Sequence, residues 1–220
     1  MTAYRKLSRR FAAAVTVVLM LGGFSATAVF AAPGAVAATA TGTASALARI
    51  QIDNFGKVDD QYYRGAQPDG RDYADLAALG VKTVIDLTRD GRSNEKGMVE
   101  RTGMTFFRIP MSTGERPADA AIKQFLSIVN DPEKQPVYVH CQGGQHRTGV
   151  MTAVYRMTKY GWTEAKAYDE MRQYKFETFF GHPELRRFVH DYYQKLTPVA
   201  SPIIATAALP GLNAVRPQAN

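Results

Sequence analysis

Ten consecutive residues carry the strongest chemical signal in the sequence. They read His140-Cys141-Gln142-Gly143-Gly144-Gln145-His146-Arg147-Thr148-Gly149. The run places a thiol directly after an apolar, β-branched segment, then two glycines, and then an arginine before a helical pattern. Glycines let successive backbone N–H groups point inward, and a helix N-terminus adds partial positive charge, so the segment predicts a concave anion site. Such a site fits a phosphate group.

The thiol and the arginine of this loop suit nucleophilic phosphoryl transfer. A helix N-terminus and a nearby cation stabilise the thiolate, which is the nucleophilic form of cysteine. The planar guanidinium of Arg147 matches two equatorial oxygens of a transferring phosphoryl group. Cys141 is therefore predicted to attack phosphorus and form a phosphocysteine, a reaction that needs no metal and no other cofactor.

Two other interpretations of the loop are weaker. A metal site built from His140, Cys141 and His146 is disfavoured because adjacent residues on a strand point to opposite faces. The chain has a single cysteine, which excludes an intramolecular disulfide and a zinc site made of several thiolates. The remaining alternative is a buried cysteine at a strand end beside an incidental arginine.

The elements around the loop alternate between strand and helix patterns. Strands are predicted at residues 62–64, 81–87, 104–109 and 137–139. Helices are predicted at residues 72–79, 93–101, 117–129, 148–160, 163–175 and 183–195. This alternation favours an α/β fold with a central, mostly parallel sheet of four or five strands flanked by helices. Ligands of such sheets bind beyond the carboxyl ends of the strands, where the Cys141 loop is expected.

The loop also carries a resemblance to a known family. His-Cys, five residues, then Arg-Thr-Gly is similar to the signature of the cysteine-dependent protein tyrosine and dual-specificity phosphatases. The histidine directly before the arginine most resembles an atypical dual-specificity branch from plants and fungi, with bacterial relatives. Two upstream segments look like the same branch, namely Tyr63-Arg64-Gly65-Ala66-Gln67-Pro68 and Val84-Ile85-Asp86-Leu87. The resemblance covers residues 55–193 and implies a dual-specificity phosphatase-like fold.

The resemblance implies a role for each loop residue. Cys141 would be the nucleophile, Arg147 would hold the phosphate, and Thr148 would hydrogen-bond the thiolate and help it leave. His140 would brace the loop from below. The remaining phosphate-binding residues would supply backbone donors: Gln142, Gly143, Gly144, Gln145 and His146.

The proton donor departs from the family pattern. Relatives protonate the leaving oxygen with an aspartate on an upstream loop, and aligning residues 110–117 with that loop puts Thr113 in its place. Glu115 is the nearest carboxylate and is predicted as the catalytic acid. Asp119, at a helix start, and the imidazole of His146 are the alternatives. A phosphoanhydride or an aryl phosphate would need little acid help, and relatives in the atypical branch act on inositol pyrophosphates.

Composition bounds the class of protein. The 220 residues are 45% hydrophobic and 21% charged, which is typical of a globular protein and excludes collagen-like, coiled-coil or mainly disordered chains. The net charge is +7, but four of the 27 basic residues lie within the first ten positions. The rest of the chain is only mildly basic, so nucleic-acid binding is not expected from charge alone.

The two ends are expected to differ from the central domain. A basic start, an apolar run over residues 11–30 and small residues before Ala31 and Ala37 predict a signal peptide at residues 1–31. The protein is accordingly expected to be exported, periplasmic or secreted. A retained membrane anchor is the alternative, and membrane contact is expected only through this uncleaved segment. Residues 32–49 are predicted as a flexible linker, residues 50–196 as the phosphatase domain and residues 197–220 as a disordered tail.

Several functions compete with the leading one. The sequence predicts a metal-independent phosphatase acting on a phosphorylated protein or a small phosphorylated molecule. The alternatives are a pseudophosphatase or phosphate-binding module, an inositol (pyro)phosphate phosphatase, and a sulfur-transfer enzyme, which also uses a cysteine loop before a helix. Outside the loop, Arg64 and Arg89 are expected to be surface residues, with a position at the mouth of the site, at the strand ends, as the alternative. His182 and His190 are expected to be ordinary surface or interface residues.

Overall fold

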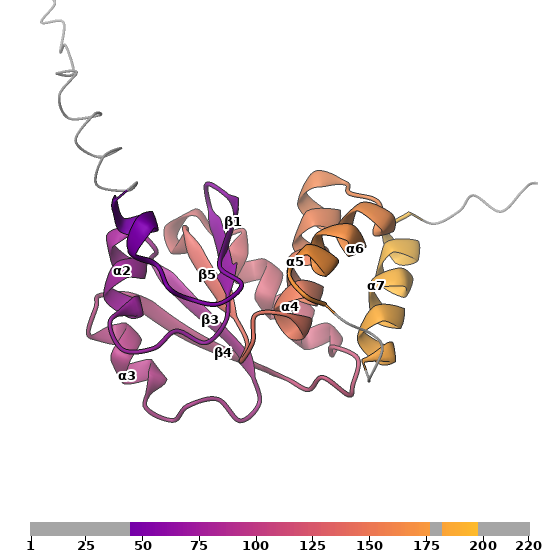
Figure 1. The fold of residues 1–220 in the computed structure, drawn as a ribbon. Coiled ribbons are helices and arrows are strands. Elements are labelled where there is room, and N and C mark those ends of the chain that lie inside the picture. The colour runs from indigo at the N-terminus through magenta and orange to yellow at the C-terminus, as the bar shows by residue number, and fades with distance from the viewer. Residues whose placement is uncertain (1–44, 177–181, 198–220) are drawn as a thin grey trace, which may run out of the picture.

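A computed structural model describes residues 45–176 and 182–197 as a five-stranded sheet with helices on both faces (Figure 1). The strands are β1 (Gly56–Asp59), β2 (Tyr62–Gly65), β3 (Thr83–Thr88), β4 (Thr105–Met111) and β5 (Val137–His140). They lie in the order β1-β2-β5-β3-β4. Only the β1 and β2 pair is antiparallel, whereas the other three neighbouring pairs are parallel. The predicted fold class is confirmed.

The helices divide between the two faces of the sheet. The first group is α2 (Asp72–Ala78) and α3 (Glu95–Glu100). The second group is α4 (Asp119–Val129), α5 (His146–Tyr160), α6 (Glu164–Gln173) and α7 (Pro183–Leu196). Of these, α4 and α5 cover the sheet, while α6 and α7 pack on α5 (Figure 1). A short 3-10 helix, η1 (Pro132–Lys134), precedes β5.

Side-chain alternation along the strands sends alternate apolar residues into two cores. In β5, Val137 and Val139 join the core under α4 and α5, whereas Tyr138 joins the core under α2 and α3. In β3, Ile85 and Val84 divide in the same way. Central strands buried on both faces read as continuous apolar runs, which is why they were predictable.

Two differences from the sequence-based elements concern the surroundings of the loop. Strand β1 was not predicted, because it has four residues and only Val58 is buried. Helix α5 begins at His146, two residues before the expected start, so the end of the phosphate loop is already helical. The other predicted elements agree with the observed ones to within two residues at each end.

The predicted ends of the domain are partly visible. Residues 45–49 are helical, Ala46 is buried, and Arg49 Nε lies 2.9 Å from Asp75 Oδ1. The linker expected over residues 32–49 is therefore packed on the domain in its last five residues. The signal peptide, the rest of the linker and nearly all of the tail lie outside the described residues. Within residues 45–176 and 182–197, no helix combines the length and apolarity needed to cross a bilayer.

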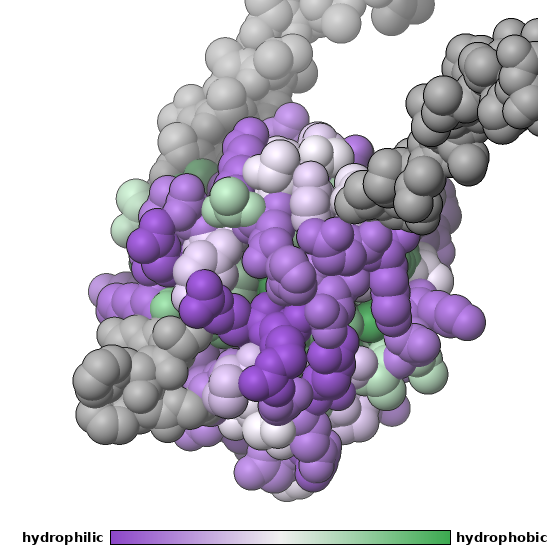
Figure 2. All heavy atoms as spheres, turned by 90° about the vertical axis from the view of Figure 1, so that its right-hand side faces the viewer, coloured by the Kyte–Doolittle hydropathy of each residue, from purple (hydrophilic) through white to green (hydrophobic). Residues whose placement is uncertain are grey.

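The surface on the side of α7 is mainly hydrophilic. Figure 2 shows this face with hydrophobic residues only in small, separate groups among the described residues. Helix α7 presents one face to α5 and α6 through Leu185, Phe188 and Val189, which are all buried. The apolar face of α7 is thus buried against α5 and α6 within the domain.

Candidate active site

The loop that carries the thiol follows the central strand of the sheet. Strand β5 lies between β2 and β3, so its carboxyl end delivers Cys141 to the middle of the sheet edge. The Cys141 side chain is buried and packs in the core beneath α5. It also reaches a cavity of about 340 Å³, which we call the phosphate cavity. Its lining residues are Thr113, Cys141, Gln142, Gly143, Gln145, His146 and Arg147.

The loop carbonyls are held away from the phosphate cavity by three donors from other segments. The Gln67 N–H, the Asn54 amide and the Arg64 guanidinium donate to the carbonyl oxygens of residues 142, 143 and 144, at 3.1, 2.7 and 2.6 Å respectively. In a trans peptide the N–H points opposite to the C=O. The N–H groups of residues 143–145 therefore face the other way, as in an anion-binding nest.

Gly144 is required by both its conformation and its surroundings. Its φ is +65°, in the left-handed region that favours glycine. A Cβ at this position would lie 2.4 Å from the carbonyl carbon of Gly65. The close approach arises because Gly65 ends β2, which pairs with β5 just before the loop. The sequence showed a flexible glycine, and the tertiary contact shows why it is needed.

Arg64 is a structural support of the loop and not the surface residue that was expected. It is fully buried, and its guanidinium stacks 3.8 Å above the Tyr174 ring in addition to bonding Gly144. Burial lowers the pKa of Arg64 from its usual value, although an arginine remains protonated. Arg64 is opposite Val139 in the β2 and β5 register, and this long-range pairing left no local signal in the sequence.

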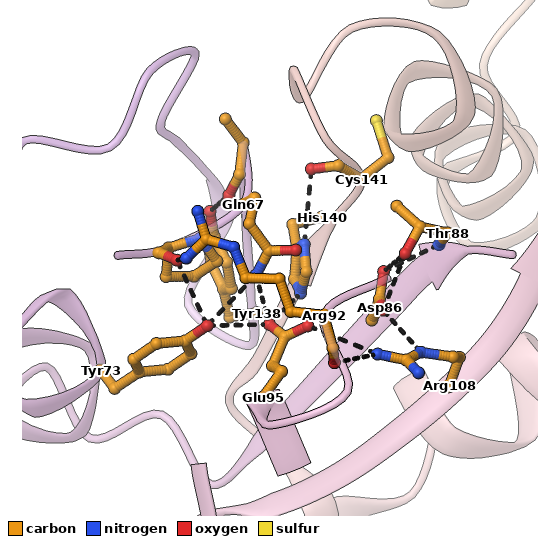
Figure 3. A network of polar contacts seen from close by, with 12 residues as sticks. Gln67, Tyr73, Asp86, Thr88, Arg92, Glu95, Arg108, Tyr138, His140 and Cys141 are labelled. Atoms are coloured by element: carbon orange, nitrogen blue, oxygen red, sulfur yellow. Dashed lines mark hydrogen bonds and ion pairs between the residues drawn. The ribbon is translucent and has the colours of Figure 1, made fainter. Parts of the chain in front are cut away.

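A buried polar network lies beneath the loop and contacts it through His140 (Figure 3). Glu95, the first residue of α3, is fully buried and accepts hydrogen bonds from Tyr73 at 3.0 Å and from Gln67 at 2.6 Å. Its Oε1 lies 3.0 Å from His140 Nε2, and His140 Nδ1 lies 3.4 Å from the Cys141 carbonyl oxygen. The Cys141 side chain points away from this network (Figure 3).

The electrostatics of Glu95 follow from this network. Burial acts to raise the pKa of its carboxyl. The hydrogen bond and the Coulomb interaction with His140, together with the hydrogen bonds from Gln67 and Tyr73, outweigh burial and hold the pKa below its ordinary value. His140 thus lies under the loop, where the resemblance placed it. Glu95 was not singled out in the sequence, because a glutamate at a helix start usually indicates only a favourable helix dipole.

Asp86, Glu95 and His140 are the described residues that come closest to a metal-ligand cluster. Their ligand atoms lie within 4.8 Å of one another. Arg108, however, places Nε 2.8 Å from Asp86 and Nη2 3.8 Å from Glu95. Thr88 donates two further hydrogen bonds to Asp86, from its N–H and its hydroxyl. The Arg108 guanidinium contacts both carboxylates and His140 contacts Glu95, so the cluster fits a hydrogen-bonded ionic network better than a divalent cation.

Arg147 lies at the phosphate cavity, whereas Thr148 is buried at the start of α5 and makes no hydrogen bond to Cys141 in the structure. Arg147 lines the phosphate cavity, and its Nη1 is 3.4 Å from the Met111 carbonyl oxygen. Arg147 Nε and Thr148 Oγ1 are buried without a hydrogen-bond partner among the described residues. An unpaired buried donor costs about 1–3 kcal/mol, a cost that a bound anion would remove at Arg147. The individual catalytic roles remain predictions.

The candidate acids are placed differently with respect to the phosphate cavity. Thr113 lines it, as the alignment with the family's acid loop implied. Glu115 does not line it, and its exposed carboxylate lies 2.6 Å from Arg89 Nη2. Asp119, at the start of α4, is also exposed and outside the lining. His146 is in the lining, so it is the only one of the three candidates at the cavity.

His182 also contacts the wall of the phosphate cavity, although the sequence suggested an ordinary surface position. Its Nδ1 donates to the Thr113 carbonyl oxygen at 3.0 Å, and its ring centroid lies 4.1 Å from that of His146. His182 immediately precedes α7, so its hydrogen bond links this helix to the segment that contains Thr113. A separation of 69 positions from Thr113 explains why no sequence pattern revealed it.

Comparisons with known proteins agree with this geometry. The family described as "DSP-PTPase phosphatase fused to NAD+ Kinase" matches residues 48–185. The "Dual specificity protein phosphatase TpbA" of Pseudomonas aeruginosa is 29% identical over 121 residues, which are 54% of each chain. The "Inositol diphosphatase SIW14" of Saccharomyces cerevisiae is 27% identical over 133 residues, 58% of this chain and 47% of that protein. This chain thus spans about half the length of these relatives.

A solved structure supports the same fold. The core catalytic domain of SIW14 from S. cerevisiae superposes with a TM-score of 0.57 at 24% identity. The match covers 68% of this chain and 92% of that domain. At this identity the similarity concerns the fold, and the chemistry rests on the residues of this chain.

Proposed function

This chain belongs to the cysteine-dependent DSP-PTPase phosphatase family, and we propose that it hydrolyses phosphomonoesters through a phosphocysteine formed on Cys141. The observation that carries this proposal is the outward orientation of three successive loop carbonyls beside a cysteine at the carboxyl end of β5. The opposing N–H groups, the start of α5 and Arg147 surround one side of the cavity with positive potential. Such a site favours a bound phosphate and a developing anionic transition state.

The proposed reaction has two steps. In the first, the Cys141 thiolate attacks phosphorus, the bond to the leaving oxygen breaks, and that oxygen receives a proton. In the second, water attacks the phosphocysteine, the S–P bond breaks, and thiolate and inorganic phosphate are released. Arg147 and the loop N–H groups hold the equatorial oxygens in both steps. The His140 and Glu95 pair positions the loop and does not touch the reacting atoms.

We assign the proton transfer to His146 in preference to Glu115. Thr113 has no proton of suitable acidity, and Glu115 pairs with Arg89 outside the cavity lining. His146 lines the cavity, and an imidazolium can donate to the leaving oxygen and afterwards accept a proton from water. Its positive form also adds to the potential that holds the phosphate.

The hydrolytic function is tested by phosphate release from para-nitrophenyl phosphate in EDTA, between about pH 4 and pH 8. The full chain should be active, whereas Cys141→Ser should lose at least about 10⁴-fold in kcat. Arg147→Lys should lose about 10²- to 10³-fold, because lysine cannot reproduce the planar bidentate contact. If neither protein turns over any phosphomonoester but both bind phosphate, the chain is a phosphate-binding module.

The assignment of the acid is tested with leaving groups of different basicity. His146→Asn should reduce kcat for alkyl phosphates about tenfold more than for aryl phosphates, since only the poorer leaving group needs the proton. Glu115→Gln should change both rates by less than about threefold. An equal loss for both substrates in His146→Asn, or a selective loss in Glu115→Gln, would contradict the assignment.

Export of the protein is a second part of the proposal and rests on the first 31 residues alone. Their basic start, apolar run and small residues are typical of a signal peptide. Substrates would then be phosphorylated proteins or small phosphorylated molecules outside the cytoplasm. Expression of the full chain in a bacterial host, followed by fractionation and N-terminal sequencing, should find the protein cleaved after Ala31 or Ala37. An intact start in the cytoplasmic fraction would refute export.

A further inference from the structure

A second cavity of about 450 Å³ adjoins the phosphate cavity and has no role in the steps above. It is lined by residues 51–53, by the segment that follows β2, by residues 90–92 after β3, and by Gln142. Gln142 lines both cavities and directly follows the nucleophile. The two cavities therefore meet at Gln142.

The lining of the second cavity is strongly acidic. It includes Asp53, Asp69, Asp72, Asp90 and one cation, Arg92. Arg92 Nη1 lies 3.0 Å from Asp69 Oδ1, so this pair is balanced internally. No other described residue forms an ion pair with the remaining three aspartates. Asp72 accepts a hydrogen bond from the Asp69 N–H at the start of α2, whereas Asp53 and Asp90 are exposed. The cavity therefore presents at least two carboxylates without a cationic partner among the described residues.

The phosphate cavity itself offers few cations beyond those needed for one phosphoryl group. The four positions between the nucleophile and His146 are neutral: Gln142, Gly143, Gly144 and Gln145. Arg89 and Arg116, on the neighbouring segments, are outside the lining of the phosphate cavity and form exposed pairs with Glu115 and Asp191. A substrate with several additional phosphates would find no cluster of free cations among the described residues of this region.

We propose that the second cavity is a specificity subsite that binds a cationic side chain close to the phosphorylated residue of a peptide. The inference rests on the proposed phosphatase function and names its substrate class. Carboxylates in a recess attract an ammonium or guanidinium group, and they repel further phosphates by the same Coulomb interaction. The site thus selects phosphopeptides with a neighbouring lysine or arginine and discriminates against inositol pyrophosphates.

The test measures binding to the full-length Cys141→Ser variant, so that it does not depend on turnover. Three fluorescein-labelled phosphotyrosine peptides would differ only in two flanking residues, which are lysine, glutamine or glutamate. The lysine peptide should bind about tenfold more tightly than the glutamine peptide, and the glutamate peptide should bind most weakly. The spread should shrink in about 0.5 M NaCl, because salt screens exposed charges. Dissociation constants equal within twofold would overturn the proposal.

A pair of charge-matched variants locates the subsite. Asp53→Asn with Asp90→Asn, added to Cys141→Ser, should reduce the lysine-to-glutamine preference to less than about threefold. Asp60→Asn with Glu133→Gln removes the same charge from exposed positions outside the cavity and should leave the preference unchanged. The proposed subsite would be overturned if the lysine-to-glutamine preference survived in the Asp53 and Asp90 variant, or disappeared in the Asp60 and Glu133 variant. Thermal melting confirms that both variants are folded.

Inositol hexakisphosphate serves as the polyanionic competitor. It should displace the lysine peptide only at concentrations at least about tenfold above the dissociation constant of that peptide. Tighter binding of this competitor would overturn the proposed substrate class. A wild-type chain without phosphatase activity would refute the proposed hydrolysis, whereas the peptide preference of Cys141→Ser would still be decided by its own result.

Discussion

The residues beneath the phosphate loop and the residues around its rim are held in opposite ways. The loop support consists of Arg64, Gln67, Tyr73, Glu95 and His140, which are buried except for the half-buried Gln67 and bond one another or the loop. The rim is residues 113–116, whose contacts include two exposed ion pairs and the bond from His182. Buried networks fix geometry strongly, whereas exposed pairs contribute little.

This difference indicates how the molecule divides its tasks. The support determines the direction of the loop N–H groups before any substrate arrives, as preorganised electrostatic stabilisation requires. The rim contributes only Thr113 to the wall of the phosphate cavity. Changes in the support should therefore reduce catalysis strongly, and most of them should also reduce stability, while changes in the rim should alter rates or affinities only modestly.

The largest expected contrast is between two glycines, one in each region. Gly144→Ala places a Cβ 2.4 Å from the Gly65 backbone at a positive φ, whereas a Cβ at Gly114 meets nothing nearer than the Ser112 hydroxyl at 3.8 Å. Gly144→Ala should lower kcat/KM at least about 100-fold and the unfolding free energy by about 2–4 kcal/mol. Gly114→Ala should change neither measurably. Urea titration and para-nitrophenyl phosphate kinetics would show this, and similar values for both variants would contradict the comparison.

The second contrast is between two arginines. Arg64→Met keeps the apolar stem but removes the donor to the Gly144 carbonyl, so kcat should fall about 10- to 100-fold through misplacement of the loop. Because the substitution also removes a desolvated charge, the unfolding free energy should change much less than the activity. Arg89→Met breaks only an exposed pair and should change kcat by less than about threefold. Equal losses in the two variants would show that Arg64 does not position the loop.

The third contrast concerns the pH dependence of stability. The pKa of Glu95 is lowered in the folded protein, so ionised Glu95 stabilises the fold above its ordinary value of 4.5 and loses this effect as the pH falls through the lowered value. Glu95→Gln should therefore cost about 1–3 kcal/mol at neutral pH and progressively less below pH 4.5. Urea unfolding at several pH values measures the difference. A cost that does not depend on pH, or one that Glu115→Gln reproduces, would contradict the role of the network.

The smallest expected effect lies at the rim. His182→Asn removes the hydrogen bond to Thr113 and the contact with the His146 ring. It should raise KM about two- to fivefold with little change in kcat, because it loosens the cavity wall and leaves the loop intact. Michaelis constants with an aryl phosphate would test this, with His190→Asn as the control because His190 pairs with Glu164 away from the site. A loss of kcat larger than that of Arg64→Met would reverse the comparison.

The sequence by itself determined the fold class, most element boundaries and the composition of the phosphate loop. Central strands are buried on both faces and therefore carry continuous apolar runs, and the cysteine, glycines and arginine occupy consecutive positions after one of them. These signals are local, because a strand, a nest and a helix N-terminus are each built from neighbouring residues. Strand β1 is the exception among the elements, since four residues with one buried side chain give too short a pattern.

Only the tertiary structure decided what holds the loop and what surrounds it. Arg64 and Glu95 support the loop from 80 and 45 positions before Gly144 and His140 respectively, and His182 reaches Thr113 across the helical layer. The placement of Glu115 outside the phosphate cavity and of His146 within it was likewise invisible in the sequence. Contacts of this kind depend on strand order and helix packing, which bring together residues whose types alone suggest an ordinary surface.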